Sequence, residues 1–459
     1  MLFSSLEFIF LFLPITLTVY YLAPKRAKNF ILFISGVIFY AFGEIRLLPI
    51  FLLTIIIDFT FGLLVERCGQ RRALARALLI LTVIFNLSLL GYFKYFDFFR
   101  TSLLGLDALG ILLPVGISFY TFQALSYVID VYRGDVKATK NIISFGAYIS
   151  LFPQLIAGPI VKYSDIERQL GERKISIPLV SSGLRRFICG LAKKVILANA
   201  SGEVFEVFAE SESYLGAILT VFFFGMQIYF DFSGYSDMAL GLGKMLGFEF
   251  VENFNYPYIS LSISEFWRRW HISLSSFFKE YVYIPLGGSR RGKLRMILNI
   301  AIVWSLTGLW HGAAFNFLLW GVYFALLLIV EKILLKKFIS RAPRVILRVY
   351  SLFFIFLGWL LFASDGVNLD AQSGLSVLSR LFFIAPSVFA QKYELLIFLG
   401  ALPFMFLLIL GSTPIPRRIY SYTTERLSAV SVILPFGALV LSVAYIVSSG
   451  YNPFLYFRF

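Results

Sequence analysis

Long apolar runs separated by short polar or basic segments recur along the whole chain. A helical run of about 20 residues is long enough to cross about 30 Å of hydrocarbon. Lipid offers the backbone no hydrogen-bond partners, so these runs are predicted to be helices. The clearest runs are residues 6–23, 30–43, 47–65, 77–93, 111–131, 214–230, 352–363, 393–410 and 430–447. The pattern predicts an all-α polytopic membrane protein with roughly eleven crossings, supplemented by re-entrant or interfacial helices.

Two stretches depart from this simple pattern. Residues 152–159 place two prolines and a glycine inside an apolar sequence, which predicts a re-entrant or broken segment buried in protein. Residues 296–330 contain no Asp, Glu, Lys or Arg and exceed one straight crossing, so they are expected to be tilted, broken or paired. We see no internal repeat and no appended soluble domain, and residues 1–459 are therefore predicted to form one integral-membrane domain.

Composition and charge support the membrane interpretation. The chain is 59% hydrophobic and only 15% charged, whereas soluble domains are about 25% charged. Its net charge of +15 would suggest nucleic acid in a soluble protein, but here the basic residues lie between apolar runs and indicate topology. Basic residues 24–28 and 66–76 are both assigned to the cytoplasm by alternation. The N-terminus is therefore predicted to be extracytoplasmic, with membrane lipid and no nucleic acid as a partner.

Motifs for metals and nucleotides are absent from the sequence. Cys68 and Cys189 belong to no CxxC pair, and the two histidines are 40 positions apart. We therefore expect no metal site and interpret the cysteines as packing residues. The first apolar run has no basic residues before it and no cleavage-like site after it, so we expect a retained span and not a signal peptide.

His311 is the sharpest candidate for chemistry. It is the only strongly basic group within the uncharged stretch 296–330, and Gly308 and Gly312 beside it permit close approach of a backbone or ligand. A buried histidine can take a proton from a hydroxyl or thiol and return it. The alternative is a structural histidine hydrogen-bonded between helices.

The other histidine, His271, follows a dense polar and aromatic sequence. Glu265 precedes Arg268 and Arg269 by three and four positions, a helical spacing that allows pairing. An interfacial amphipathic helix with tryptophan anchors explains most of this segment. For His271 itself, substrate contact and structural hydrogen bonding remain open.

Further polar residues are candidates for supporting roles. Asp231, Asp237 and Asn253 lie near aromatic residues, where a carboxylate would be able to orient a histidine; capping or mutual hydrogen bonding is the simpler reading. Arg290, Arg291 and Lys293 lie in a glycine-rich basic loop that would suit the phosphates of a cytosolic donor, although basic juxtamembrane loops are common.

Seven sequence blocks, following one another in order over nearly the whole chain, carry a family resemblance. The chain resembles a membrane-bound O-acyltransferase (MBOAT) of the bacterial alginate O-acetyltransferase branch. The blocks are residues 113–120, 152–159, 229–237, 252–254, 266–275, 309–312 and 452–454.

The resemblance implies a helical bundle around a central tunnel that joins the two faces of the bacterial inner membrane. The family's near-invariant histidine falls on His311, as general base or acyl relay, and His271 matches a second histidine typical of this branch. Asp231, Asp237, Asn253 and Trp310 are candidate supporting or substrate-contacting residues.

The same resemblance implies acetyl-CoA as the cytosolic donor and an extracytoplasmic polysaccharide as the final acceptor. An SGNH-hydrolase-like partner protein outside the cytoplasm would complete the transfer. Three alternatives stay open from sequence: D-alanyl transfer from a carrier protein to teichoic acid, a polysaccharide or lipid transporter, and a lipid acyltransferase.

Overall fold

The computed structural model describes residues 1–69, 71–364, 371–384 and 388–455. These residues form helices and connecting segments, with no β-strand among them. The chain divides into two compact units: Met1–Phe187 with Tyr235–Glu252, and Ile188–Gly234 with Asn253–Phe459. The predicted all-α class is confirmed, and the single domain over residues 1–459 stays a prediction.

Eight helical segments of the described chain are long and apolar enough to cross a membrane, and Phe8–Leu22 is a shorter apolar one. The eight are Lys25–Arg67, Arg72–Ser102, Tyr214–Met245, Lys293–His311, Phe315–Ile333, Arg344–Ala363, Lys392–Gly411 and Val430–Ser448. Hydropathy predicts roughly eleven crossings, and the run expected at residues 111–131 corresponds to the 17-residue helix Ile117–Arg133, which is not among these segments. Lys25–Arg67 holds two successive helices within one continuous segment.

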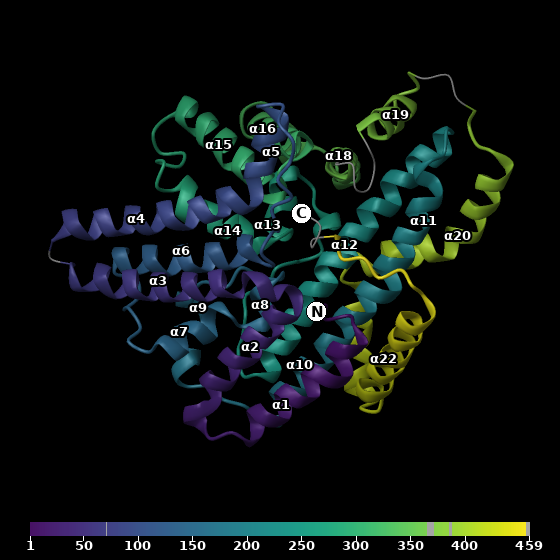
Figure 1. Cartoon of the computed structure of the whole chain (residues 1–459). Coiled ribbons are helices and arrows are strands. Elements are labelled where there is room, and N and C mark those ends of the chain that lie inside the picture. The colour runs from purple at the N-terminus through teal and green to yellow at the C-terminus, as the bar shows by residue number, and fades with distance from the viewer. Residues whose placement is uncertain (70, 365–370, 385–387, 456–459) are drawn as a thin grey trace. The chain divides into compact units, whose positions relative to one another are not determined.

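The first unit is built around three neighbouring helices, α3, α4 and α6, which run side by side (Figure 1). A buried hydrogen bond of 2.8 Å from Asn86 Nδ2 of α4 to Asp58 Oδ1 of α3 satisfies polar groups on the facing sides. The helices of this unit are α1 Leu13–Leu22, α2 Lys28–Glu44, α3 Leu48–Arg67, α4 Arg72–Leu90, α5 Phe96–Ser102, α6 Ile117–Arg133, α7 Ile142–Ile149, α8 Phe152–Leu155, α9 Tyr163–Gly171 and most of α10 Ile177–Ala192.

The broken segment predicted from the two prolines at residues 152–159 includes the short helix α8. It is only four residues long, and residues 151–161 are all buried. Gly116 has a φ of 71°, and a Cβ there would overlap the carbonyl oxygen of Leu155. Glycine is therefore required where the segment before α6 meets α8.

The second unit contains the helices that surround both histidines. They include α15 Lys293–His311 and α16 Phe315–Ile333, which pack against each other (Figure 1). The others are α11 Ala200–Ala209, most of α12 Tyr214–Met245, α13 Ile263–Arg269, α14 Ile272–Phe278, α17 Lys336–Arg341, α18 Arg344–Ala363, α19 Ala371–Leu381, α20 Lys392–Gly411, α21 Ile415–Arg426 and α22 Val430–Ser448. A π-helical segment, Lys193–Asn199, follows α10.

The uncharged stretch 296–330 is both broken and paired. Helix α15 ends at His311, and α16 begins at Phe315 after three intervening residues. The two helices approach closely at Gly308 and Gly321, because a Cβ at Gly308 would overlap the carbonyl oxygen of Phe317. Small residues at such a crossing let two membrane helices pack backbone to backbone, and this crossing places the end of α15 beside α16.

Candidate active site

Short helix α13 is anchored at its N-terminus by two side chains. Ser262 Oγ accepts a hydrogen bond of 3.0 Å from the backbone N–H of Glu265, which is the usual action of an N-cap serine. The buried carboxylate of Glu331 on α16 accepts from the backbone N–H groups of Ile263 and Ser264, at 2.6 and 2.8 Å. The free N–H groups of the first turn are thus satisfied, which fixes where α13 begins.

His271 lies between α13 and α14 in an unusual backbone conformation. Its φ and ψ are 45° and 55°, the left-handed region, and it forms the N-cap of α14. A residue other than glycine costs about 1–2 kcal/mol in this region. Such strain is retained only where surrounding contacts enforce it, and it often marks a functional position.

Asn253 fixes the orientation and tautomer of the His271 ring. Asn253 Oδ1 lies 3.1 Å from His271 Nδ1 and accepts a 2.8 Å hydrogen bond from Ser273 Oγ. Since an amide oxygen only accepts, Nδ1 carries the proton and Nε2 keeps the lone pair. Burial lowers the pKa of His271 to about 3, because an imidazolium would lose its hydration. His271 is therefore a neutral imidazole whose Nε2 can accept a proton or hydrogen bond.

His311, the last residue of α15, is enclosed by aromatic rings. The ring centroids of Trp310, Trp320 and Phe362 lie 5.0, 5.0 and 5.4 Å from its own, all edge-on. Its side chain is only 4% exposed. Trp310 also contacts the His271 ring at 5.8 Å, so one indole touches both imidazoles.

A cavity of about 300 Å³ has His271 in its wall. It reaches Thr307, which precedes His311 by one turn of α15. Every charged residue in the described lining is basic, namely Arg268, Lys279 and Lys332. The remaining lining residues are Ser264, Trp267, Leu274, Ser275, Phe278, Tyr283, Ile300, Val303, Trp304, Thr307 and Leu328. The cavity thus combines cations, aromatic faces and a neutral imidazole, which suits an anionic ligand with an apolar portion.

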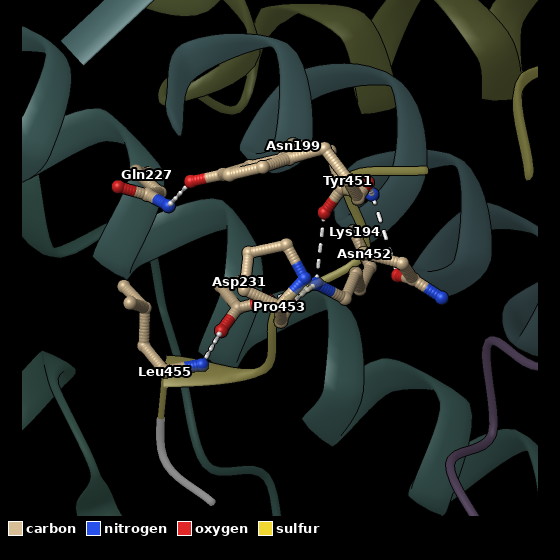
Figure 2. Close-up of polar contacts among 8 residues, drawn as sticks. All are labelled: Lys194, Asn199, Gln227, Asp231, Tyr451, Asn452, Pro453 and Leu455. Atoms are coloured by element: carbon tan, nitrogen blue, oxygen red, sulfur yellow. Dashed lines mark hydrogen bonds and ion pairs between the residues drawn. The ribbon is translucent and has the colours of Figure 1, made fainter. Parts of the chain in front are cut away.

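The two aspartates proposed from sequence have cationic partners. Asp231 forms an ion pair with Lys194 at 2.8 Å (Figure 2). Asp237, which belongs to the other unit, pairs with Arg186 at 2.8 Å, and Arg186 also binds Glu252. Their role in supporting a histidine stays a prediction, as does that of Asn253 and Trp310 in catalysis.

The basic loop and the cavity cations are different residues. Arg290, Arg291 and Lys293 are exposed and do not belong to the lining of the cavity, and their donor-binding role stays a prediction. Sequence reasoning missed Lys279 and Lys332. Lys332 lies two residues after the uncharged stretch, and a cation so close to such a stretch is a signal that would have found it.

Comparisons with known proteins identify the family of the chain. The model of the MBOAT, membrane-bound O-acyltransferase family, matches residues 135–363, which include both histidines and the whole cavity lining. A probable alginate O-acetylase of Pseudomonas putida is 37% identical, with 100% of both chains covered. The chain belongs to the membrane-bound O-acyltransferase family. The predicted family and enzyme class are confirmed, and the chain is a multi-pass membrane O-acyltransferase.

Two other relatives of this acyltransferase carry different names. A peptidoglycan O-acetyltransferase of Helicobacter pylori is 34% identical, over 82% of this chain and 79% of its own. A teichoic acid D-alanyltransferase of Bacillus subtilis is 30% identical, over 47% of this chain and 58% of its own.

Proposed function

We propose that this acyltransferase acetylates hydroxyl groups of an extracytoplasmic polysaccharide, such as an alginate-like, cell-wall or other exopolymer. The observation that carries the proposal is the cavity that holds three cations and His271 and reaches the turn of α15 before His311. The similarity over the full chain to a probable alginate O-acetylase, and over most of it to a peptidoglycan O-acetyltransferase, supports acetyl transfer to a polymer.

Acetyl-CoA is the donor that best suits the cavity. Arg268, Lys279 and Lys332 provide charge-assisted hydrogen bonds for phosphate oxygens. Trp267 and Trp304 offer apolar faces for the thiol-bearing arm of the donor. The thioester would then lie toward Thr307 and His311.

In the proposed reaction, His311 acts as general base. It takes the proton from the acceptor hydroxyl as the oxygen attacks the thioester carbonyl, forming the new ester bond. The carbon–sulfur bond breaks, and the departing thiolate receives the proton from the histidine. The products are the acetylated acceptor and the free thiol, so the reaction needs no further reactant. An acyl relay through His311 is the alternative in which the imidazole itself carries the acetyl group briefly.

His271 has a second, distinct role in the proposal. Its unprotonated Nε2 belongs to a residue of the cavity wall, where it accepts a hydrogen bond from the acyl donor or the acyl acceptor.

We place the protein in the bacterial inner membrane with an extracytoplasmic N-terminus. A separate SGNH-hydrolase-like protein would receive the acetyl group and pass it to the polymer.

The test uses purified protein in liposomes with labelled acetyl-CoA, with and without the partner. His311→Gln should lower turnover by at least about 100-fold, the usual contribution of a general base. Gly400→Ala is the control, since a Cβ at Gly400 meets open space; it should retain full turnover.

Replacing Lys279 and Lys332 with Gln should raise KM for acetyl-CoA and leave kcat nearly unchanged, because the cations bind the donor away from the reacting carbonyl. Equal activity of wild type and His311→Gln would overturn the catalytic assignment. Turnover with an aminoacylated carrier protein and none with acetyl-CoA would favour D-alanyl transfer instead.

A further inference from the structure

Four polar side chains of the second unit are almost completely buried around the C-terminal segment, residues 451–455 (Figure 2). They are Lys194, Asn199, Gln227 and Asp231, with exposed fractions of 1, 2, 3 and 1%. Ionisable groups at such depth are costly, and they persist where they have a specific partner.

The charged pair binds the backbone of the C-terminal segment at two points. Lys194 Nζ donates to the carbonyl oxygen of Pro453 and, at 2.8 Å, to Asn199 Oδ1. Asp231 accepts 2.9 Å from the backbone N–H of Leu455 through Oδ2, while its Oδ1 lies 2.8 Å from Lys194 Nζ. One backbone acceptor and one backbone donor, two residues apart, are thus matched to one cation and one anion.

The side-chain amides of Asn199 and Gln227 bind the two residues that precede Pro453. Asn199 Nδ2 donates to the carbonyl oxygen of Tyr451 at 3.1 Å and to Asn452 Oδ1 at 3.3 Å. Gln227 Nε2 donates to the hydroxyl of Tyr451 at 3.2 Å. All four side chains therefore bind one short segment, largely through its backbone.

The pair and the segment stabilise each other. A buried ion pair repays its desolvation only when additional hydrogen bonds satisfy its remaining protons and lone pairs. Here Pro453 and Leu455 provide such bonds. Without the segment, the pair would lie buried with unmade hydrogen bonds, which is an expensive state.

The same turn of α12 also supports His271. Phe232 follows Asp231 directly, and its ring lies 4.7 Å edge-on from the His271 ring. Phe232 also packs on Phe254 at 5.0 Å, and Asn253 beside it holds the His271 imidazole. A shift of this turn would therefore be transmitted to the imidazole in the cavity wall.

We propose that Lys194 and Asp231 form a latch that fastens residues 451–455 to α12 and thereby positions Phe232 against His271. In this role, Asp231 does not touch the reacting groups; it is a positioning residue that holds the C-terminal segment of the chain. The binding of residues 451–455 by Lys194 and Asp231 is inferred from the contacts alone. Only the expected effect on turnover rests on the proposed function.

The test is hydrogen exchange of residues 449–455 in the full chain reconstituted in nanodiscs. Lys194→Met with Asp231→Leu replaces the pair by apolar side chains of similar size, a change that buried pairs often tolerate. We expect exchange in this segment to become about 100-fold faster, as for the loss of two charge-assisted hydrogen bonds. Arg186→Met breaks an ion pair of the first unit and should leave exchange in the segment unchanged.

Turnover provides the second readout. The double variant should lower kcat and leave KM for acetyl-CoA unchanged, and it should have no added effect in a chain truncated after Gly450. Lys194→Asp with Asp231→Lys keeps opposite charges but reverses donor and acceptor, so it should not restore protection.

Protection retained in the apolar double variant, or restored by the reversed pair, would overturn the latch. Fast exchange with unchanged kcat would overturn the coupling to His271. Wild-type protein inactive toward acetyl-CoA would count against the proposed function alone, because the exchange measurement needs no donor.

Discussion

At the residue scale, the two histidines occupy different environments. Burial keeps His271 a neutral imidazole, Asn253 sets its tautomer, and the residue belongs to the cavity wall. His311 lies at the end of α15 within a group of aromatic rings. Trp310 contacts both imidazoles, so a shift of either imidazole ring would displace the indole that packs against the other imidazole.

The depressed pKa of His271 predicts a loss of stability in acid. The folded protein binds a proton at His271 only near pH 3, whereas an unfolded histidine does so near its usual pKa of about 6.5. The unfolded state therefore binds more protons as pH falls below about 6.5, and stability drops. Between about pH 7.5 and about pH 5, His271 alone should cost the folded state about 2 kcal/mol.

Thermal unfolding in nanodiscs at several pH values measures this loss. His271→Gln, which has no titrating proton, should lose correspondingly less stability over the same interval. An identical pH dependence of wild type and variant would mean that His271 is not held neutral in the folded protein.

Sequence reasoning found both histidines because the chain has only two and ionisable groups beside apolar stretches are conspicuous. It found Asn253 only as a candidate, since nothing in the sequence shows which acceptor faces His271 Nδ1. The cavity cations Lys279 and Lys332 were not predicted as site residues, because each lies next to an ordinary basic or aromatic segment of the sequence. Only the tertiary fold brings Lys279, which follows α14, and Lys332 of α16 to one cavity.

At the element scale, the α15–α16 pair determines where His311 lies. The helices meet at Gly308, one turn before the histidine, and the chain breaks directly after it. A second fixed point is Glu331 on α16, which accepts hydrogen bonds at the start of α13. Helix α16 therefore contacts both α13 and α15, and both of these helices contribute residues to the cavity lining.

A side chain at Gly308 should separate this pair. Gly308→Ala places a Cβ against the carbonyl oxygen of Phe317, and such overpacking costs about 1–3 kcal/mol. We expect a lower unfolding temperature and a reduced kcat, because His311 moves with the end of α15. Gly437→Ala, whose Cβ meets open space in α22, should be neutral in both measurements; equal effects of the two would refute a tight crossing.

Removal of the Glu331 charge should loosen α13. Glu331→Gln replaces one acceptor oxygen by a donor that faces the N–H group of Ile263 or Ser264, at a cost of about 3 kcal/mol for the buried site. We expect lower thermal stability and weaker donor binding, measured by unfolding in nanodiscs and by KM for acetyl-CoA. Tyr350→Phe loses only the 3.3 Å bond to Glu331 and should have a small effect; a loss as large as that of Glu331→Gln would locate the anchor elsewhere.

At the scale of the whole molecule, topology follows from the order of apolar runs and basic segments. Cys68 follows α3 directly and lies in segment 66–76, which is predicted to be cytoplasmic. Residues 203–212 are acidic and are predicted to lie on the opposite side.

Impermeant maleimide should therefore label Cys68 in a Cys189→Ala variant from the cytoplasmic side only. In a chain with both cysteines replaced by Ala, Glu210→Cys should react from the extracytoplasmic side, since Glu210 is exposed. Labelling is read by mass shift in intact and inverted vesicles. Reaction of both positions from the same side would contradict the predicted alternation.

The sequence by itself determined the helical membrane class, the family and the broken segment at 152–159, and it predicts a catalytic role for His311. These follow from local signals, because apolar length, prolines and rare charges act where they stand in the chain. The tertiary structure alone decided that residues 296–330 form a close pair and that three cations share a cavity with His271. It also decided that Asp231 binds Lys194 and Leu455. These contacts join residues far apart in sequence, and their energies depend on burial and geometry that exist only after the helices have packed.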